Sequence, residues 1–333
     1  MKKIWLTDTT LRDGSHSVSH QYSIDQAVTI AKALDDAEID IIEISHGDGL
    51  AGSSLQYGFS KATDNDLIKE VSGVIKNSKL AVLILPGIGT SADLEIARKY
   101  GAEVARVATH VTEADVSQQH IKVAKSMGMK TVGFLMMVHM APVENLVEQA
   151  KLMESYGADI VYCTDSSGAL LPDGVKERIT ALKENLSVDI GFHAHDNLNL
   201  AIGNSLAAIE AGATYVDCSL NGAGAGAGNA RTESLVAVLK KSGYETNADL
   251  YKTLDTAEKV FRKIVPEATR PNDLTLMLGY AGVYSSFLLH TYKAAEKFHV
   301  DPREILVELG KRKVVGGQED SIIEVAYEMS QKK

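Results

Sequence analysis

The sequence predicts a TIM (β/α)8 barrel of the α/β class, followed by a smaller all-helical C-terminal domain. Three observations lead to this prediction. The chain has 333 residues, enough for a barrel of roughly 250 residues with an appendage. Short apolar runs alternate eight times with longer amphipathic segments. Polar or glycine-rich residues follow every apolar run, as at the active-site face of barrel enzymes.

The eight apolar runs are expected to be parallel strands, because they are almost continuously hydrophobic, as strands buried on both faces are. They cover Lys3–Thr7, Ile39–Ile44, Ala81–Leu85, Ala105–Ala108, Thr131–Met136, Ile160–Cys163, Ile190–His193 and Tyr215–Ser219. An open doubly wound sheet is the alternative, but no Gly-x-Gly-x-x-Gly follows the first run. The barrel is therefore favoured.

Helix signals lie between the strands and dominate the C-terminal part. Ser23-Ile-Asp-Gln26 resembles a capping box that opens a helix through Leu34, and glycines at helix–strand joins provide C-terminal caps. We expect the barrel to occupy residues 1–245 and a helical domain residues 246–333. The expected helices of that domain are Leu250–Val265, Leu276–Phe298 and Asp301–Gly310.

Composition excludes several function classes. The net charge of −10 and the pI of about 5.5 argue against nucleic acid or an anionic membrane as the main partner. No apolar stretch reaches the ~18 residues that span a bilayer, and the first residues lack a signal-peptide pattern. Cys163 and Cys218 lack metal-site or redox spacing. We therefore expect a cytoplasmic protein with a small-molecule substrate.

A divalent metal site is predicted from the first and seventh strand ends. His193 and His195 are two residues apart in a strand, so both imidazoles point to one face and can meet one ion. With Asp13 opposite, two imidazoles and one carboxylate leave open positions, which is typical of catalytic sites. The absence of a thiolate favours Mn²⁺, Mg²⁺ or Co²⁺. Ordinary core or surface histidines are the alternative.

Two further groups near Asp13 could serve the chemistry. The fork of Arg12 suits a substrate carboxylate or an enolate oxygen, although it could simply neutralise the neighbouring acids. His16 could move a proton, or be a surface histidine, and chemistry alone does not separate it from His20. Asp8 is better suited to a supporting hydrogen-bond acceptor on the first strand.

The glycine-rich segment Gly222–Gly228 allows two interpretations. It could cradle a phosphate at a helix N-terminus, but no P-loop Lys or Ser/Thr follows it. A tight turn that presents Asn229 or bare amides to the site is the favoured interpretation.

These motifs resemble the metal-dependent lyase and aldolase superfamily that opens with Thr10-Leu-Arg-Asp-Gly14. Within it, the chain is most similar to the class II 4-hydroxy-2-oxovalerate aldolases of aromatic meta-cleavage pathways. The similarity covers nearly the whole chain and includes Arg12-Asp-Gly-Ser-His16, Ser45-His-Gly-Asp-Gly-Leu50, Leu85-Pro-Gly-Ile-Gly89, Arg106-Val-Ala-Thr-His110, Gly279-Tyr-Ala-Gly-Val-Tyr-Ser-Ser286 and Val315-Gly-Gly-Gln-Glu-Asp320.

The resemblance implies a role for each site residue. Asp13, His193 and His195 would hold the metal, typically Mn²⁺. Arg12 would stabilise a pyruvate enolate, and His16 would take the 4-hydroxyl proton. Arg12, Ser166, His193 and Tyr284 would contact the substrate, with Tyr284 coming from the helical domain as a further catalytic residue. Such aldolases are oligomers and bind an acylating aldehyde dehydrogenase, partly through the helical tail.

The sequence departs from this family at the predicted mouth. Asp196 stands where a histidine is usual, Cys163-Thr-Asp-Ser-Ser167 replaces Ala-Asp-Ser-Gly, and Asn221 and Arg231 also differ. These changes bear on the substrate more than on the reaction type. The alternatives are a Claisen-type synthase or lyase acting on an acyl-CoA, and an idle barrel that only binds metal or pyruvate for another enzyme.

Overall fold

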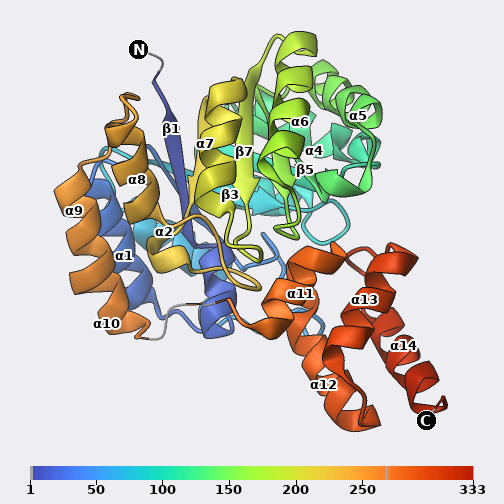
Figure 1. Ribbon diagram of the computed structural model, residues 1–333. Helices are drawn as coiled ribbons and strands as arrows, with labels where there is room; N and C mark the ends of the chain where they lie inside the picture. Colours follow the sequence, from blue (N-terminus) through green and yellow to red (C-terminus); the bar gives the residue numbers. More distant parts are fainter. Residues whose placement is uncertain (1–2, 267–268, 270, 333) are drawn as a thin grey trace.

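The computed structural model describes residues 3–266, 269 and 271–332 and contains a closed parallel barrel (Figure 1). Each strand pairs with its neighbours in the chain, and the eighth closes on the first, so the predicted α/β TIM barrel is confirmed. Within the described residues the strands are β1 (Trp5–Leu11), β2 (Ile41–Ile44), β3 (Lys79–Ile84), β4 (Val104–His110), β5 (Lys130–Met136), β6 (Ile160–Asp165), β7 (Asp189–Ala194) and β8 (Tyr215–Cys218).

Amphipathic helices surround the barrel and bury their apolar faces against it. They are α1 (Ile24–Asp36), α2 (Asp64–Ser72), α3 (Ser91–Lys99), α4 (Gln118–Ser126), α5 (Val143–Tyr156), α6 (Pro172–Asn185), α7 (Ala201–Ala211) and α8 (Thr232–Lys241). The capping box of α1 is confirmed, since Ser23 accepts from the Gln26 amide and Gln26 accepts from the Ser23 amide. Two orphan amides of the first turn are thereby satisfied.

The first strand is longer than predicted, and this places its polar residues. The expected strand ended at Thr7, but β1 continues to Leu11, with Asp8 paired beside Ile42 and Cys218. Buried Asp8 accepts hydrogen bonds from the Thr10 amide and the Thr232 hydroxyl, so it supports the backbone, as expected. The 3₁₀ turn η1 (Asp13–Val18) follows and carries Asp13 and His16 to the mouth.

Residues that follow α8 first pack on the barrel and only then form a separate core. Helix α9 (Leu250–Asp255) lies against α8 and α1, the π-helix η5 (Thr256–Phe261) lies against α1, and α10 (Arg262–Ile264) continues η5. Phe261 and Val265 belong to the barrel core, whereas the second apolar core begins at Leu274. The change of core therefore lies beyond the boundary predicted at residues 245 and 246. A sequence pattern gives the apolar face of a helix but not the surface that this face meets.

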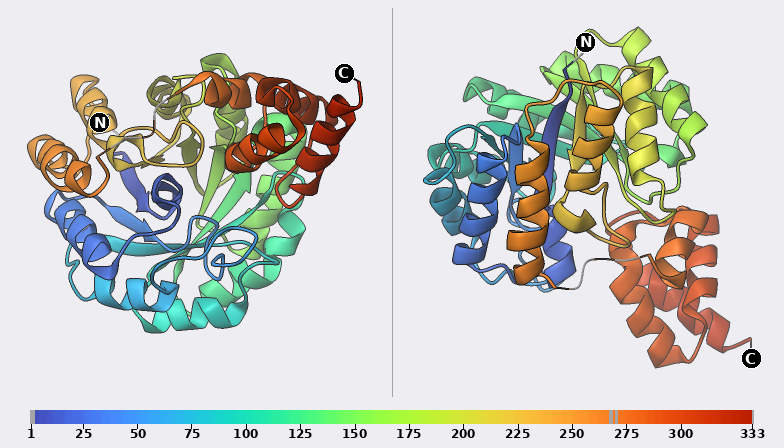
Figure 2. Two further views of the ribbon diagram at one scale, coloured as in Figure 1. Left: turned by 90° about the horizontal axis from the view of Figure 1, so that it is seen from below. Right: turned by 60° about the vertical axis from the view of Figure 1, so that its left-hand side comes forward.

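The second core joins α11 (Asp273–Ala281), α12 (Leu288–Phe298), α13 (Pro302–Arg312) and α14 (Asp320–Ser330). The left view of Figure 2 looks at the carboxyl ends of the strands. In this view the four helices cover one side of the barrel mouth. No helix of the described residues is both long and apolar enough to cross a lipid bilayer.

The helix predicted over Leu276–Phe298 is interrupted, and residues of the interruption line the cavity at the barrel mouth. We expected a continuous helix over Leu276–Phe298, but α11 ends at Ala281 and α12 begins at Leu288. Gly282 is the cause, because it caps α11 with a φ of 67°, in the left-handed region. The segment from Val283 through the turn η6 (Ser285–Phe287) then turns toward the barrel mouth.

Candidate active site

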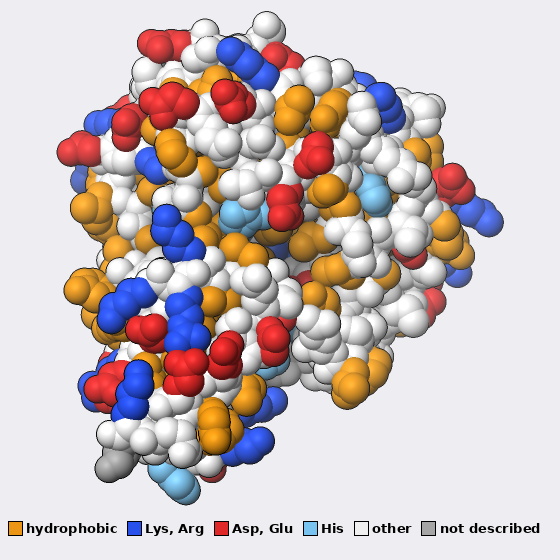
Figure 3. Space-filling view, turned by 90° about the vertical axis from the view of Figure 1, so that its right-hand side faces the viewer, with side chains coloured by type: hydrophobic (Ala, Val, Ile, Leu, Met, Phe, Trp, Pro, Cys, Tyr) orange, Lys and Arg blue, Asp and Glu red, His pale blue; other side chains and the backbone are white. Residues whose placement is uncertain are grey.

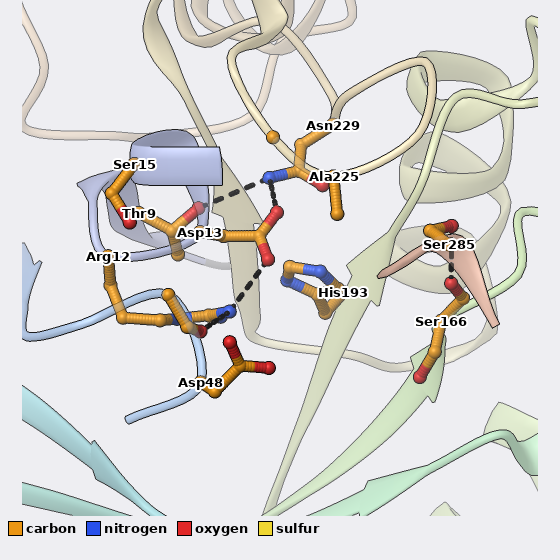
Figure 4. A network of polar contacts seen from close by, with 12 residues as sticks. Thr9, Arg12, Asp13, Ser15, Asp48, Ser166, His193, Ala225, Asn229 and Ser285 are labelled. Atoms are coloured by element: carbon orange, nitrogen blue, oxygen red, sulfur yellow. Dashed lines mark hydrogen bonds and ion pairs between the residues drawn. The ribbon is translucent and has the colours of Figure 1, made fainter. Parts of the chain in front are cut away.

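The three predicted metal-binding residues meet at the barrel mouth. Asp13 comes from η1 after β1, His193 from β7 and His195 from the residue just beyond it. One potential ligand atom from each lies within 4.8 Å of the others, and all three side chains are buried. Figure 4 shows Asp13 and His193 pointing into the same space.

Hydrogen bonds leave the ring nitrogens in a state that suits a metal. His193 Nδ1 lies 2.8 Å from Asp217 Oδ2, and His195 Nδ1 lies 3.2 Å from the Ala225 carbonyl oxygen. Both partners are acceptors, so each Nδ1 carries the proton and each Nε2 keeps its lone pair. Burial lowers the pKa of His195 to about 4, against the opposing charge of Asp13. This imidazole is therefore neutral near pH 7.

The Asp13 carboxylate is held at both oxygens. Oδ1 accepts from Arg12 Nη1 at 2.8 Å, and Oδ2 accepts from Asn229 Nδ2 at 2.6 Å (Figure 4). Burial alone would raise the pKa of Asp13, but Arg12 and the nearby histidines outweigh it and hold this pKa far below the usual range. The carboxylate is thus an anion in a fixed orientation.

Arg12 has one donor left for a ligand. Its Nε donates to Glu43 Oε2 at 2.8 Å and its Nη1 to Asp13. Its Nη2 is buried and has no hydrogen-bond partner among the residues that the structure describes. A buried donor without an acceptor costs free energy, and this residue lines the same cavity as Asp13 and His193. The Nη2 donor suits an oxygen atom of a substrate.

His16 and His20 have different surroundings, which the sequence did not reveal. His16 is half-buried and lines the cavity with Arg12 and Asp13. His20 is buried behind it, with Nδ1 2.9 Å from Ser15 Oγ and its ring stacked 3.9 Å from that of His46. Burial and the neighbouring histidines lower the pKa of His20 to about 3. His16 alone of the two contacts the cavity, so it is the better proton acceptor.

The glycine-rich segment forms the tight turn that presents Asn229. Its amides serve the protein, because Gly224 N donates to Ser17 Oγ and Ala227 N to Asn197 Oδ1. A Cβ on Gly224 would lie 2.7 Å from both Asn229 Nδ2 and Asp13 Oδ2, so only glycine fits above this contact. These two amides are not available to a phosphate, and the contact between Asn229 and Asp13 agrees with a turn that presents Asn229 to the site.

The helical domain contributes Tyr284 to the same cavity. Its hydroxyl lies 3.7 Å from Met136 Sδ, and burial together with Asp48 and Asp13 raises the pKa of the phenol. Ser166 also lines the cavity, but its hydroxyl accepts from the Met137 amide at 3.1 Å. Its carbonyl accepts from Ser285 Oγ at 2.8 Å (Figure 4). The structure thus brings every predicted site residue to one cavity.

Sequence reasoning missed the residues that hold this arrangement. Fully buried Asn197 donates to the Ser167 carbonyl and to Ser285 Oγ, and it accepts from the Ala227 amide. It thereby joins three loops of the mouth to the helical domain. The Asp-Asn pair that follows His195 was the available signal. Asp196, the unusual residue, accepts from the Ala201 amide at the start of α7 and does not line the cavity.

The arrangement can bind a divalent cation beside a fixed guanidinium, a neutral phenol and a histidine base. Two imidazoles and one carboxylate leave coordination positions for a ligand. A bidentate oxygen ligand could fill these positions while one of its oxygens meets Arg12 Nη2. Such a site suits chemistry in which negative charge develops on an oxygen next to a carboxylate.

Comparisons with known proteins agree with this geometry. Residues 3–260 match the family model described as HMGL-like, and residues 269–331 match the DmpG-like communication domain. A protein of Carboxydothermus hydrogenoformans, named 4-hydroxy-2-oxovalerate aldolase, is 64% identical over 99% of this chain and 98% of its own length. A Geobacillus stearothermophilus protein of the same name is 61% identical over 100% of this chain and 97% of its own.

Solved structures share the fold at lower identity. The carboxyl transferase domain of Rhizobium etli pyruvate carboxylase superposes with a TM-score of 0.84 and 18% identity, over 100% of this chain and 61% of that one. The Bacillus subtilis HMG-CoA lyase superposes with a TM-score of 0.70 and 22% identity, over 82% and 96%. These likenesses bear on the fold alone.

Proposed function

The chain belongs to the HMGL-like family, among the 4-hydroxy-2-oxovalerate aldolases, and we propose the roles by which its residues carry out the retro-aldol cleavage. It is a carbon–carbon lyase that depends on a divalent metal. Neither alternative, the acyl-CoA enzyme or the idle barrel, is favoured by relatives that match the full chain.

One observation carries the assignment of the metal site. Asp13, His193 and His195 converge within 4.8 Å while both histidines keep Nε2 free. This donor set of one carboxylate and two imidazoles fits Mn²⁺, which we propose as the bound ion, ahead of Mg²⁺ or Co²⁺. A divalent metal bound there supplies Lewis acidity toward the carboxylate and 2-keto oxygens of the substrate.

The remaining groups divide the work of cleavage. His16 accepts the proton of the 4-hydroxyl group, the C3–C4 bond breaks, and the bonding electrons pass to the 2-keto oxygen as the aldehyde leaves. Arg12 Nη2 donates to that oxygen as negative charge develops on it. Protonation at C3 then gives pyruvate. No lysine Schiff base is required for this route.

Tyr284 and Ser166 complete the substrate contacts. The phenol of Tyr284 stays neutral, because burial and two carboxylates raise its pKa, so it can donate a hydrogen bond to the substrate. The Ser166 hydroxyl already accepts from Met137, which leaves its proton available for a substrate carboxylate oxygen. His193 lies against the substrate as well as the metal.

The substrate assignment is tested by pyruvate release from a panel of 4-hydroxy-2-oxo acids that differ in chain length. We expect 4-hydroxy-2-oxovalerate, which yields acetaldehyde, to be cleaved with the highest kcat/KM. Acetyl-CoA with a 2-oxo acid serves as the control for the Claisen-type alternative. Thioester turnover without pyruvate release would contradict the proposed reaction.

The DmpG-like communication domain supports a second proposal, that the chain binds an acylating aldehyde dehydrogenase as part of an oligomer. Acidic and basic side chains mix on the lobe that ends at the C-terminus, with hydrophobic side chains between them (Figure 3). In the same domain, Tyr280 of α11 and Leu289 of α12 are 75% and 60% exposed. Both features suit a protein interface with hydrophobic anchors and a polar rim.

Size-exclusion chromatography with an acylating aldehyde dehydrogenase tests this partner. We expect co-elution that Tyr280→Ser weakens. Tyr251→Ser, which changes a similarly exposed tyrosine (80%) on α9, should leave co-elution intact. Separate elution of the wild-type proteins at micromolar concentration would contradict the proposal.

We further propose that the chain acts in the cytoplasm, where the buried thiols of Cys163 and Cys218 remain reduced.

A further inference from the structure

A buried arginine lies beneath the metal site, inside the barrel. Arg106 of β4 is 1% exposed, and its guanidinium carbon lies 4.6 Å from the ring centroids of both Phe134 and Tyr162. Its Nη1 lies 2.9 Å from Glu43 Oε1, and its Nη2 donates to Asp217 Oδ2. Both carboxylates are themselves almost fully buried. Arg106 therefore bridges two anions that solvent does not reach.

Each of these carboxylates continues to a residue of the site. Glu43 Oε2 accepts from Arg12 Nε at 2.8 Å, and Arg12 in turn donates to Asp13. On the other side, Asp217 Oδ2 accepts from His193 Nδ1 at 2.8 Å. A series of hydrogen bonds and one ion pair, between Arg106 Nη1 and Glu43 Oε1, thus runs from Asp13 to His193 beneath the cavity. We call Glu43, Arg106 and Asp217 the interior charge layer.

This layer occupies positions that barrels usually fill with apolar residues. Glu43, Arg106, Tyr162 and Asp217 come from β2, β4, β6 and β8, the alternate strands that form one layer of a barrel interior. Branched apolar side chains fill such layers in most barrels. Desolvating buried ions is expensive, and apolar replacements are often equally or more stable. Stability alone therefore gives no reason for charges here.

We propose that Arg106 is a positioning residue that, through Glu43 and Asp217, fixes the Arg12 guanidinium and the His193 imidazole relative to each other. This inference rests on the proposed function. The Asp217 carboxylate selects the His193 tautomer with a free Nε2. Glu43 orients Arg12 so that its Nη2 stays unpaired in the cavity.

The charges of this series also suit a cation. The three carboxylates of Asp13, Glu43 and Asp217 exceed the two guanidiniums of Arg12 and Arg106 by one negative charge. A divalent ion at Asp13 and His193 therefore meets a complementary field. Arg106 reduces the repulsion between the carboxylates of Glu43 and Asp217, because its guanidinium contacts both of them.

Three conservative variants distinguish the effect of Asp217 on His193 from the effect of Glu43 on Arg12. Asp217→Asn should weaken Mn²⁺ binding by about 10- to 100-fold, since it replaces the charged acceptor of His193 Nδ1 with a neutral amide that can also present an N–H to this nitrogen. Glu43→Gln should weaken binding of oxalate, a planar dianion that mimics an enolate of a 2-oxo acid, by about tenfold at saturating Mn²⁺. Arg106→Lys keeps the charge but loses the fork, so it should weaken both.

The readouts are direct titrations of Mn²⁺ and oxalate, with thermal unfolding of each metal-free variant as the folding control. Arg98→Lys makes the same exchange on α3, at the protein surface, and should change neither affinity. The inference is supported by an effect of Asp217→Asn on Mn²⁺ that exceeds its effect on oxalate, with the reverse for Glu43→Gln. If Arg106→Lys does not fold, the opposite effects of Asp217→Asn and Glu43→Gln on the two affinities decide whether the inference holds.

Two results would overturn the inference. One is wild-type affinity of Arg106→Lys for both probes. The other is an equal loss of both affinities in Asp217→Asn and Glu43→Gln, which a merely structural layer would give. Absence of Mn²⁺ binding by the wild-type chain would instead overturn the proposed function itself, and the inference with it.

Discussion

Asn229 donates a hydrogen bond of 2.6 Å to Asp13, although 216 residues separate the two in the chain. The contact joins the glycine-rich segment after β8 to the carboxylate that we propose as a metal ligand after β1. It fixes one oxygen of Asp13 while Arg12 fixes the other. The orientation of the Asp13 carboxylate therefore depends on both ends of the barrel sequence.

Asn229→Ala should weaken metal binding by about 10- to 100-fold, because outer partners of metal ligands typically contribute that much. Isothermal titration with Mn²⁺ measures the effect. Asn185→Ala, on the exposed face of α6, serves as the control and should bind Mn²⁺ as the wild type does. Equal affinities of the Asn229 variant and the wild type would show that the contact does not position Asp13.

Removal of a metal ligand and removal of the base should have different effects. Asp13→Ala or His195→Ala should abolish both Mn²⁺ binding and turnover, because two ligands are too few for a stable site. His16→Ala should keep Mn²⁺ bound and lower kcat by roughly 10²–10⁴, the usual contribution of a general base. Metal content and steady-state rates distinguish the cases. Loss of Mn²⁺ from the His16 variant would place His16 among the ligands.

Ser285→Ala should loosen the helical domain at the mouth. The Ser285 hydroxyl donates to the Ser166 carbonyl at 2.8 Å and accepts from Asn197 Nδ2 at 2.9 Å, and both partners are buried. Loss of these bonds should lower the free energy of unfolding by about 1–3 kcal/mol, and kcat/KM should fall as Tyr284 shifts. Ser330→Ala, at the last residue of α14, is the control, because the hydrogen bond from its hydroxyl to the Tyr327 carbonyl is exposed. An unchanged kcat/KM in Ser285→Ala would show that Ser285 does not position Tyr284.

Acidification should destabilise the chain through His139. This imidazole contacts Ser167 Oγ and the Gly282 carbonyl, each at 3.1 Å, and burial lowers its pKa to about 4. The unfolded pKa is about 6.5, so the unfolded chain binds more protons between these values. The stabilising contribution is complete above about pH 6.5 and is lost as the pH falls toward 4.

Denaturant titrations of the metal-free wild type and of His139→Gln at several pH values measure this contribution by difference. The difference is needed because Asp8 and Asp165, whose pKa values burial raises to about 6, act in the opposite sense. We expect the wild type to lose more stability than the variant between pH 6.5 and 4. Parallel pH dependence of the two proteins would contradict the assignment.

The barrel and the convergence of Asp13, His193 and His195 could be predicted because their signals are local. Apolar runs repeat with a regular spacing, and His193 and His195 reveal a shared face through a spacing of two residues. The partner Asp13 could be inferred because all strand ends meet at one face. For the same reason, His16 and Arg12 were placed near the metal site.

The contacts beneath and above the site could not be predicted, because they join residues that no local pattern connects. Glu43, Arg106 and Asp217 each stand alone in an apolar strand, and only barrel closure brings them together. The break at Gly282 was missed since one glycine is also tolerated inside helices. The end of α11 at Gly282 determines where Tyr284 and Ser285 lie. The spacing of apolar residues in the sequence does not show where this helix ends.

Pyruvate release from 4-hydroxy-2-oxovalerate, measured on chelator-treated protein during titration with Mn²⁺, tests whether cleavage depends on a metal held at Asp13. We expect negligible release without metal, a rise in rate with occupancy of one Mn²⁺ site, and no recovery in Asp13→Ala. Full release by protein shown to contain no bound metal would contradict it.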